Sequence, residues 1–299
     1  VGVSPTAESV AHAFADLVVP KSLIAAIGPA VASGKGLFLY GKPGNGKTSI
    51  AERLALIFGN SIYIPYAIAV DEYIIKLYDP VVHKAEKAVL GQDGRWVSVS
   101  RPVVVVGGEL TLDALDIKFN PTMGICEAPF QLKANCGVLV VDDFGRQQMA
   151  PEALLNRWIV PLEKRTDFLA LPNGRKLCLP FDPMVVFSTN LDPTALIDEA
   201  FLRRIPYKIP VDDPTEEIFL ALLKRMSEVL DVEATQVDFE YLIQAHYHNT
   251  GRPFRYCQPR DLLTLVRDQC RFYGQPQKMT RITIDRAAGC YFLPVTGVY

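Results

Sequence analysis

From Gly36 to Val211, short apolar runs alternate with segments whose apolar residues recur at helical spacing. In one such segment, Ile50, Leu54 and Ile57 fall on the same face of a helix. An almost entirely apolar run is typical of a strand that is buried on both faces of a parallel sheet. The alternation therefore predicts an α/β fold with a parallel core sheet covered by helices. We expect five core strands, over residues 36–40, 61–64, 137–141, 184–189 and 207–211.

The pattern changes after Asp212. Apolar positions then recur only at helical spacing, and Pro214 can stand in the first turn of the next helix. We therefore expect an α/β domain over 1–211 and a small helical domain over 212–299. The helices of the second domain are expected around 215–230, 238–247, 259–273 and 282–292.

Two stretches depart from the simple alternation. Residues 92–120 carry strand-forming residues around the pair Gly107–Gly108, which predicts a β-hairpin inserted between the second and third core strands. In 167–180, the pair Asn173–Gly174 separates two alternating apolar segments, which is the strongest short signal for a hairpin turn. We expect a hairpin insertion at each place.

Composition and charge exclude several classes of protein. With 299 residues, 49% of them apolar, the chain can bury a sizeable core. Charged residues make up 21% and nearly cancel, to a net charge of −2, so no overall field favours nucleic acid or an anionic membrane. No apolar run approaches the roughly 18 to 20 residues that span a bilayer. The start of the chain lacks a basic segment followed by an apolar core. We expect a cytoplasmic protein without a membrane span.

Cysteine and histidine give no sign of a metal site. The six cysteines form no CxxC pair and no regular framework, which favours reduced, mostly buried thiols and argues against zinc. His246 and His248 are two residues apart on an expected helix, so they point to different sides of it.

The first chemical motif is the segment 41–48, which fits GxxxxGK[ST] and lies between an expected strand and an expected helix. In that setting, backbone N–H groups and the positive start of the helix surround phosphate oxygens. Lys47 is expected to reach the β- and γ-phosphates, and the Thr48 hydroxyl to hold Mg²⁺. The motif predicts that ATP and Mg²⁺ are bound by Gly41, Pro43, Gly44, Asn45, Gly46, Lys47, Thr48 and Ser49.

The second motif is an acidic pair, Asp142 and Asp143, at the end of the run 137–141. In phosphoryl transfer one carboxylate can fix the magnesium, and a second can orient or deprotonate the attacking water. Two carboxylates at a strand end can also form an ordinary turn. Their combination with the segment 41–48 favours the functional interpretation, with Asp142 as a metal ligand beside Thr48 and Asp143 as the candidate base.

With these motifs in order, the chain from about Phe14 to its end resembles the AAA+ ATPase family of P-loop NTPases. The run FSTN ends in Asn190, which matches the first sensor of that family. The segment DEAFLRRI resembles the one that carries the arginine finger, which leaves Arg203 and Arg204 as candidates. CQPRDLLTLV resembles the start of the helix of the lid domain, where Arg260 takes the place of the second sensor. The resemblance thus implies catalytic roles for Lys47, Asp142, Asp143, Asn190, Arg203, Arg204 and Arg260.

The resemblance also implies an assembly and a kind of work. The hairpin expected over 167–180 lies between the acidic pair and the first sensor, and looks like the pre-sensor insertion of the magnesium-chelatase and MoxR-like branches. The family forms rings or open homo-oligomers, here expected to be a hexamer, with active sites shared between subunits. We expect a chaperone-like motor that hydrolyses ATP to remodel a protein client. Arg175 and Lys176 of the hairpin are expected to face that client.

One departure from the family pattern keeps alternatives open. The family usually has Asp-Glu where this chain has Asp142 and Asp143, so the catalytic carboxylate is one methylene shorter. This favours, as an alternative, a nucleotide-gated scaffold or switch with little hydrolysis. A DNA motor or loader is a further alternative, against which the near-neutral charge speaks.

Overall fold

The computed structural model describes most of the chain, namely residues 5–59, 61–87, 91, 93–196 and 199–292. The outer ends of the two predicted domains, 1–4 and 293–299, and the first residue of the predicted insertion 92–120 lie outside the described residues. The chain forms two compact units. The first comprises Val1–Gly41 and Lys47–Pro210, and the second comprises Lys42–Gly46 and Val211–Tyr299.

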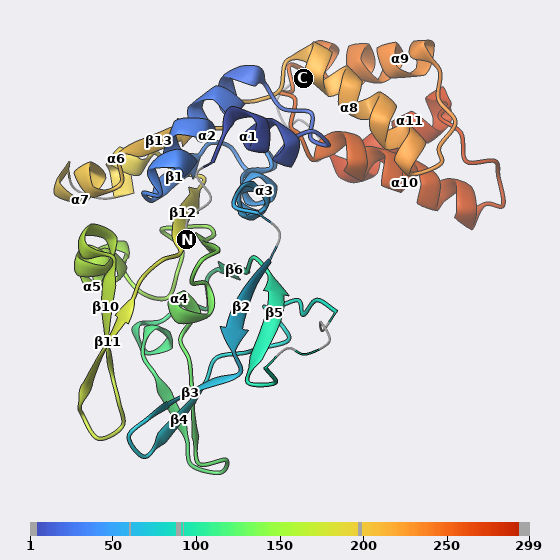
Figure 1. The fold of residues 1–299 in the computed structure, drawn as a ribbon. Coiled ribbons are helices and arrows are strands. Elements are labelled where there is room, and N and C mark those ends of the chain that lie inside the picture. Colours follow the sequence, from blue (N-terminus) through green and yellow to red (C-terminus); the bar gives the residue numbers. More distant parts are fainter. Residues whose placement is uncertain (1–4, 60, 88–90, 92, 197–198, 293–299) are drawn as a thin grey trace. The chain divides into compact units, whose positions relative to one another are not determined.

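The first unit is built on a parallel sheet of five strands, which confirms the predicted α/β fold. All of β9 and β12, and nearly all of β1, is buried, so these strands are apolar without alternation. Numbered along the chain, the spatial order of the five strands is 5-1-4-3-2. In that order they are β13 (Tyr207–Pro210), β1 (Leu37–Tyr40), β12 (Met184–Thr189), β9 (Val138–Val141) and β6 (Val103–Val106) (Figure 1).

One of the predicted core strands is wrong. The run 61–64 lies in β2 (Ser61–Pro65), which pairs antiparallel with β5 (Trp96–Ser100) outside the core sheet. The fifth place in the core sheet belongs to β6, which pairs in parallel with β9. Both runs are short and apolar, so their patterns alone do not separate a core strand from a ribbon strand. Burial separates them, because Val104 and Val106 are buried whereas Tyr63 is 56% exposed.

The predicted hairpin over 92–120 is also wrong. The residues on the two sides of the expected turn at Gly107–Gly108 do not form a strand pair, because β6, which precedes the turn, pairs with β9 in the core sheet. The Gly107–Gly108 pair follows the end of a core strand instead of forming a hairpin turn. The rest of the stretch contains the 3-10 helix η1 (Leu112–Leu115) and β7 (Lys118–Asn120).

Helices cover the core sheet. α5 (Pro151–Lys164) and α7 (Glu199–Arg204) bury Trp158 and Phe201 in one cluster with Phe38 and Phe187 of the sheet. α3 (Lys47–Ile57) packs on β1, β9 and β12 from the side opposite α5 (Figure 1). The remaining helices of this unit are α1 (Ala7–Ala13), α2 (Lys21–Ser33), α4 (Phe130–Lys133) and α6 (Pro193–Leu196).

Additional strands extend the first unit beyond the core sheet. A four-stranded sheet has the order β3 (Ala67–Val70), β4 (Tyr73–Lys76), β8 (Ile125–Glu127) and β7. β10 (Thr166–Ala170) and β11 (Lys176–Pro180) form an antiparallel hairpin over the stretch where one was predicted. Leu169 and Leu171 share an apolar cluster with Ile75 and Val99, so this hairpin packs against the additional strands.

The tip of the β10–β11 hairpin is tied to the turn between β3 and β4. Arg175 donates from Nη1 to Asp71 Oδ2 at 2.6 Å, and Asn173 Nδ2 lies 3.4 Å from Glu72 Oε1. Arg175, which was expected to face a client, therefore has a partner within the chain, whereas Lys176 is exposed.

The second unit is helical, as predicted. Thr215, Thr235 and Thr280 each stand before a helix and accept a hydrogen bond from a backbone N–H of its first turn. Phe219, Leu242 and Leu263 lie in the apolar core that the helices share. The elements are α8 (Glu216–Val229), α9 (Gln236–His246), the 3-10 turn η2 (His248–Thr250), α10 (Gln258–Phe272) and α11 (Arg281–Tyr291).

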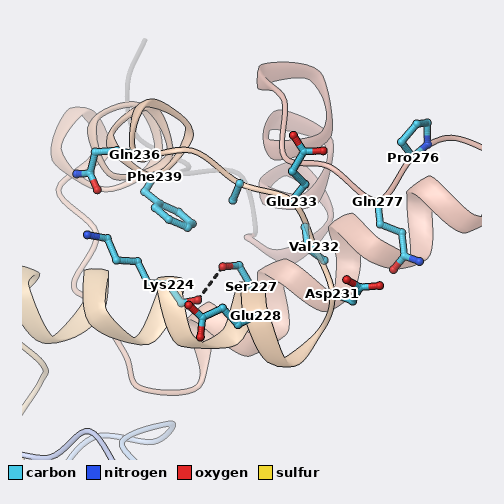
Figure 2. A pocket seen from close by; sticks show the side chains of 11 residues that line it. Lys224, Ser227, Glu228, Asp231, Val232, Glu233, Gln236, Phe239, Pro276 and Gln277 are labelled. Carbon is cyan, nitrogen blue, oxygen red and sulfur yellow. Dashed lines mark hydrogen bonds between the residues drawn. The ribbon is translucent and has the colours of Figure 1, made fainter.

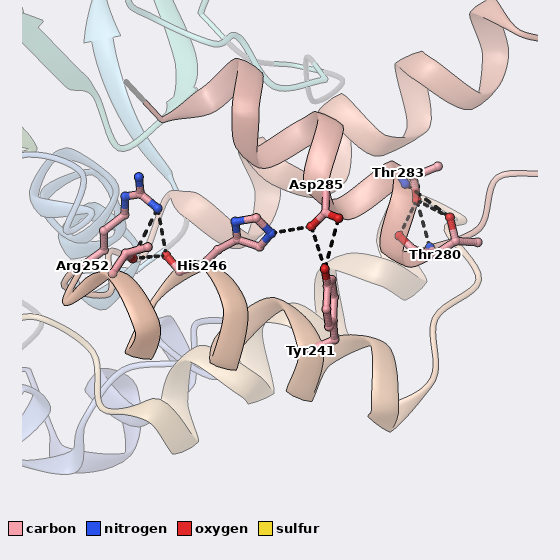
Figure 3. Close-up of polar contacts among 7 residues, drawn as sticks. Tyr241, His246, Arg252, Thr280, Thr283 and Asp285 are labelled. Carbon is pink, nitrogen blue, oxygen red and sulfur yellow. Dashed lines mark hydrogen bonds and ion pairs between the residues drawn. The ribbon is translucent and has the colours of Figure 1, made fainter. Parts of the chain in front are cut away.

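The two histidines of this unit have separate partners. His246 Nε2 lies 2.8 Å from Asp285 Oδ1, and Asp285 also accepts from the Tyr241 hydroxyl, so this triplet joins α9 to α11 (Figure 3). His248 Nε2 lies 3.0 Å from Glu216 Oε2. In the described part of the chain, no helix combines the length and apolar character that crossing a membrane requires.

Gly137 offers a test of the packing beside the core sheet. A Cβ atom there would lie 2.1 Å from the carbonyl oxygen of Pro102, which accepts a hydrogen bond from Val138 N. We predict that Gly137→Ala lowers the free energy of unfolding by about 1–3 kcal/mol, because the backbone must shift. Thermal unfolding followed by circular dichroism measures this loss.

Gly289→Ala is the matched control. Gly289 is exposed in α11, and an added Cβ comes within 4 Å of no described residue apart from its chain neighbours and the backbone of its own helix. Alanine should stabilise this helix by about 0.5–1 kcal/mol. Equal unfolding midpoints for the two variants would contradict the packing at Gly137.

Candidate functional site

The segment 41–48 forms a loop that leads from β1 into α3. Three of its glycines have positive φ, namely Gly41 at 145°, Gly44 at 81° and Gly46 at 77°, where other residues are strained. α3 begins at Lys47, directly after the loop. The first N–H groups of a helix lack partners within it and favour anions. The local backbone is therefore suited to phosphate oxygens.

The register of the parallel strands gathers three segments at one edge of the sheet. Tyr40, the last residue of β1, is paired with Thr189 at the end of β12, and Gly41 N donates to Thr189 O at 3.2 Å. Val141, the last residue of β9, is paired with Phe187. The loop, the acidic pair and the residue after β12 consequently leave the sheet side by side.

Lys47 is the cation of this edge. Its side chain is buried, and Nζ donates to the carbonyl oxygen of Gly41 at 2.9 Å and to Asn190 Oδ1 at 2.7 Å. Burial lowers the pKa of Lys47, although the nearby Asp142 and Asp143 act in the opposite direction. The ammonium is thus held in place with little water around it.

Asn190 joins Lys47 to the acidic pair. Its Nδ2 donates to Asp143 Oδ1 at 2.8 Å, while its oxygen accepts from Lys47. Asp143 has a φ of 48°, in the left-handed region that Asp tolerates better than most residues. The two bonds fix the orientation of the Asn190 amide, because the oxygen must face the cation and the nitrogen must face the carboxylate.

Thr48 and Asp142 bring two oxygen ligands together. Thr48 Oγ1 donates to Asp142 Oδ2 at 2.8 Å, and Asp142 Oδ1 accepts from the backbone N of Asp143 at 3.0 Å. Mg²⁺ prefers oxygen ligands, and proteins usually hold it through one or two carboxylates together with substrate phosphates and water. A hydroxyl next to a carboxylate fits that pattern. No group of three or more His, Cys, Asp and Glu suited to a metal occurs among the described residues.

Two residues that the sequence did not indicate hold the segment after the acidic pair. Gln147 donates from Nε2 to the carbonyl oxygen of Asp142 and accepts from Gly145 N, both at 2.8 Å. Thr189 Oγ1 donates to Phe144 O at 2.8 Å. Their roles depend on how the backbone turns after β9, for which the sequence carries no motif.

The remaining predicted loop residues divide into exposed and buried ones. Pro43 and Ser49 are exposed, whereas Asn45 is 2% exposed. Asn45 Nδ2 donates to Asp213 Oδ1 at 2.8 Å and to the carbonyl oxygen of Val211 at 3.2 Å. These contacts lie within the second unit, which contains Lys42–Gly46.

The structure distinguishes the two candidate finger arginines. Arg204 Nε donates to Glu163 Oε1 at 2.6 Å, and its guanidinium lies 5.6 Å from the centre of the Phe201 ring. Arg203 is exposed, and no residue in the described ranges forms a hydrogen bond or an ion pair with it. No contact within those ranges joins either arginine to Lys47.

Arg260, the predicted second sensor, belongs to the second unit. It is exposed and lies in the first turn of α10. The residues that the structure brings into contact are therefore those of the first unit, namely Lys47, Thr48, Asp142, Asp143 and Asn190.

A polar pocket of about 870 Å³ lies elsewhere, in the second unit between α8 and the segments around 231–236 and 276–277 (Figure 2). Lys224, Glu228 and Asp231 are among its lining residues. None of the predicted site residues lines it, so it adds no support to the candidate site.

Comparison with solved structures finds proteins that share this fold. RuvB of Thermotoga maritima, a Holliday junction branch migration motor, matches with a TM-score of 0.52 and 15% identity, over 89% of this chain and 66% of that chain. NtrX from Brucella abortus, solved in complex with ATP, matches with a TM-score of 0.57 and 14% identity, over 93% of this chain and 57% of that one. The chain thus spans just under two thirds of RuvB and a smaller share of NtrX. At these identities the likeness shows a shared fold.

The other comparisons add little. A profile described as Domain of unknown function (DUF8689) matches residues 215–290, which lie in the helical unit. The comparison with curated proteins finds no match.

Proposed function

We propose that this chain, which has the fold of the AAA+ P-loop ATPases, binds ATP with Mg²⁺ and hydrolyses it. The observation that carries the proposal is the contact group at the edge of the core sheet, where one buried cation, one hydroxyl and two carboxylates meet. Each of these groups corresponds to one requirement of phosphoryl transfer.

Lys47 supplies positive charge for the β- and γ-phosphates. Its ammonium is already held by Gly41 O and Asn190 Oδ1, so little side-chain entropy remains to be lost when a phosphate arrives. Because it is buried, its attraction to a phosphate oxygen is weakened less by water than that of an exposed lysine.

Thr48 and Asp142 would hold the magnesium ion, through the hydroxyl and through the carboxylate. When bound, this ion neutralises charge on the phosphates. The hydrogen bond between Thr48 and Asp142 holds the hydroxyl and the carboxylate next to each other.

Asp143 is the proposed base. It takes a proton from a water molecule whose oxygen attacks the γ-phosphorus, while the bond to the bridging oxygen of ADP breaks. Asn190 holds the Asp143 carboxylate at 2.8 Å and so limits its rotation.

We propose Arg203 as the arginine finger that reaches the ATP of a neighbouring subunit. The ion pair of Arg204 with Glu163 supports this choice, because a finger must have its guanidinium available to a phosphate. The proposed assembly is a homo-oligomeric ring, a hexamer, and Arg260 is proposed to sense the γ-phosphate. The proposed work of the assembly is remodelling of a protein client.

A nucleotide-gated switch with little hydrolysis is the second candidate. The hydrogen bond from Asn190 to Asp143 favours it, because one oxygen of this carboxylate is already occupied by an amide and is less available to a water molecule. RuvB is a DNA motor, but the net charge of −2 speaks against a DNA substrate here. Measuring ATP turnover with added protein or DNA distinguishes the three possibilities, since only the matching substrate stimulates a motor and none stimulates a switch.

The role of Asp143 can be tested by Asp143→Asn. The amide cannot accept a proton, so turnover should fall by about 10²- to 10⁴-fold while ATP affinity is retained. Phosphate release and ATP titration measure the two effects separately. Asp182→Asn, at an exposed position before β12, is the matched control and should keep the parental rate. An Asp143→Asn variant with parental turnover would show that Asp143 is not the base.

The shared site can be tested by mixing two inactive variants, Lys47→Ala and Arg203→Ala. Loss of a finger should lower turnover by about 10³- to 10⁵-fold. In mixed assemblies some interfaces combine an intact Lys47 with an intact Arg203, so part of the activity should return. Arg204→Ala is the control on the neighbouring residue and should keep most of the turnover. Mixtures that co-assemble by mass measurement yet stay inactive would argue against a shared site.

A further inference from the structure

The tip of the phosphate-binding loop is held by residues far away in the sequence. Asn45 uses both hydrogens of its side-chain amide within the second unit, one toward the carbonyl oxygen of Val211 and one toward Asp213 Oδ1. Asn45 is 2% exposed, so these bonds are shielded from water. The loop tip is thereby attached to the segment 211–213.

Asp213 extends the attachment to a second segment. Its other oxygen, Oδ2, pairs with Arg255 Nη1. Arg255 is itself fixed, because its backbone N donates to Gln258 Oε1 at 2.8 Å and its Nη1 also donates to Phe254 O at 3.1 Å. Asp213 thus bridges the loop tip and the chain just before α10.

A second contact joins the loop to the residues just before α10. Cys257 N donates to the carbonyl oxygen of Gly44 at 3.0 Å. A Cβ atom at Gly44 would lie 2.7 Å from Cys257 Sγ, so the two segments approach closely at this point. Gly44 therefore has two reasons to be glycine, its positive φ and this approach.

The residues that hold the backbone of Arg255 in place are buried. Gln258, the first residue of α10, is 8% exposed and accepts through Oε1 from the Tyr247 hydroxyl at 3.0 Å. Tyr247 is 1% exposed and lies in the apolar core of the helical unit. The anchor of the loop tip is thus continuous with the packed core.

We propose that Asp213 is a positioning residue for nucleotide binding. Together with Arg255 and the backbone of Cys257, it clamps the tip of the phosphate-binding loop to the start of the helix that carries Arg260. The inference rests on the proposed function, since it takes the loop to bind phosphates. Asp213 acts through Asn45, whose position sets the loop backbone and so the convergence of its N–H groups.

The clamp couples triphosphate binding to the contacts of Asp213 and Arg255, which do not touch the phosphates. A triphosphate that orders the loop also favours the clamped state of Asp213 and Arg255, and by reciprocity an intact clamp favours the triphosphate. Removing the clamp should weaken ATP binding although every group proposed to touch ATP is still present.

The test is a titration with Mg²⁺-ATP of the full chain and of three variants. Asp213→Ala should bind ATP about tenfold more weakly, as expected when a buried amide loses a charged hydrogen-bond partner. Asp213→Asn keeps an acceptor for Asn45 and should stay within about threefold of the parental affinity. Glu233→Ala, which removes the exposed ion pair with Lys278, is the matched control and should not change the affinity.

A double-variant cycle separates positioning from general loss of stability. If Asn45 and Asp213 act through one bond, Asn45→Ala combined with Asp213→Ala should weaken binding no more than either change alone. Multiplicative effects would overturn the clamp. Circular dichroism checks that the variants are folded. Should Asp213→Ala unfold, Asn45→Ala carries the test, because it keeps the Asp213–Arg255 pair, and an unchanged affinity then overturns the inference.

The experiment also separates the two proposals. If the parental chain binds no ATP, the proposed function fails and the clamp fails with it. If the parental chain binds ATP and Asp213→Ala binds it equally tightly, the clamp alone fails.

Discussion

The parallel, in-register pairing of β1, β12 and β9 is the constraint on which the site depends. It fixes the ends of three strands at one edge, so that the loop after Tyr40, the acidic pair after Val141 and Asn190 after Thr189 meet there. A slip of one residue in β12 would turn its side chains to the opposite faces of a sheet that is buried on both. The apolar core therefore protects the geometry of polar groups that lie outside it.

The polar groups at this edge satisfy one another before any ligand arrives. Lys47 is bonded to Asn190, Asn190 to Asp143, and Thr48 to Asp142. A buried cation without such partners would be costly, and burial alone already lowers the pKa of Lys47. A triphosphate must therefore replace existing bonds, so its affinity is a difference between two sets of contacts. Residues that hold the loop in shape therefore contribute to the affinity, as do residues that would touch the phosphates.

The parts of the site that lie close together in the sequence could be predicted from it. The segment 41–48 carries glycines at the positions where the loop needs positive φ angles, and the acidic pair directly follows the end of an apolar run. The sequence predicts that short apolar runs form strands, but it does not predict which of these runs join the core sheet. Residues 61–64 and 103–106 are both short and largely apolar runs, and packing decides which of them enters the core sheet.

Contacts between distant segments carried no signal in the sequence. Asn45 looked like one of several phosphate-loop residues, whereas its side chain is bonded to Asp213, 168 positions away. Arg203 and Arg204 are neighbours in the sequence, and they differ because Glu163 and the ring of Phe201 lie within reach of Arg204. In both cases the outcome depends on which side chain a folded neighbour presents, which residue types and spacing do not encode.

The most direct test of the nucleotide site is calorimetric titration of the parental chain and of Lys47→Ala with Mg²⁺-ATP. We expect saturable binding to the parental chain and a loss of affinity of about a hundredfold in the variant, because a buried cation that pairs with phosphate is removed. Circular dichroism should show that the variant keeps its fold. Equal affinity in the two proteins, or no binding to the parental chain, would contradict the assignment of this edge of the sheet as a nucleotide site.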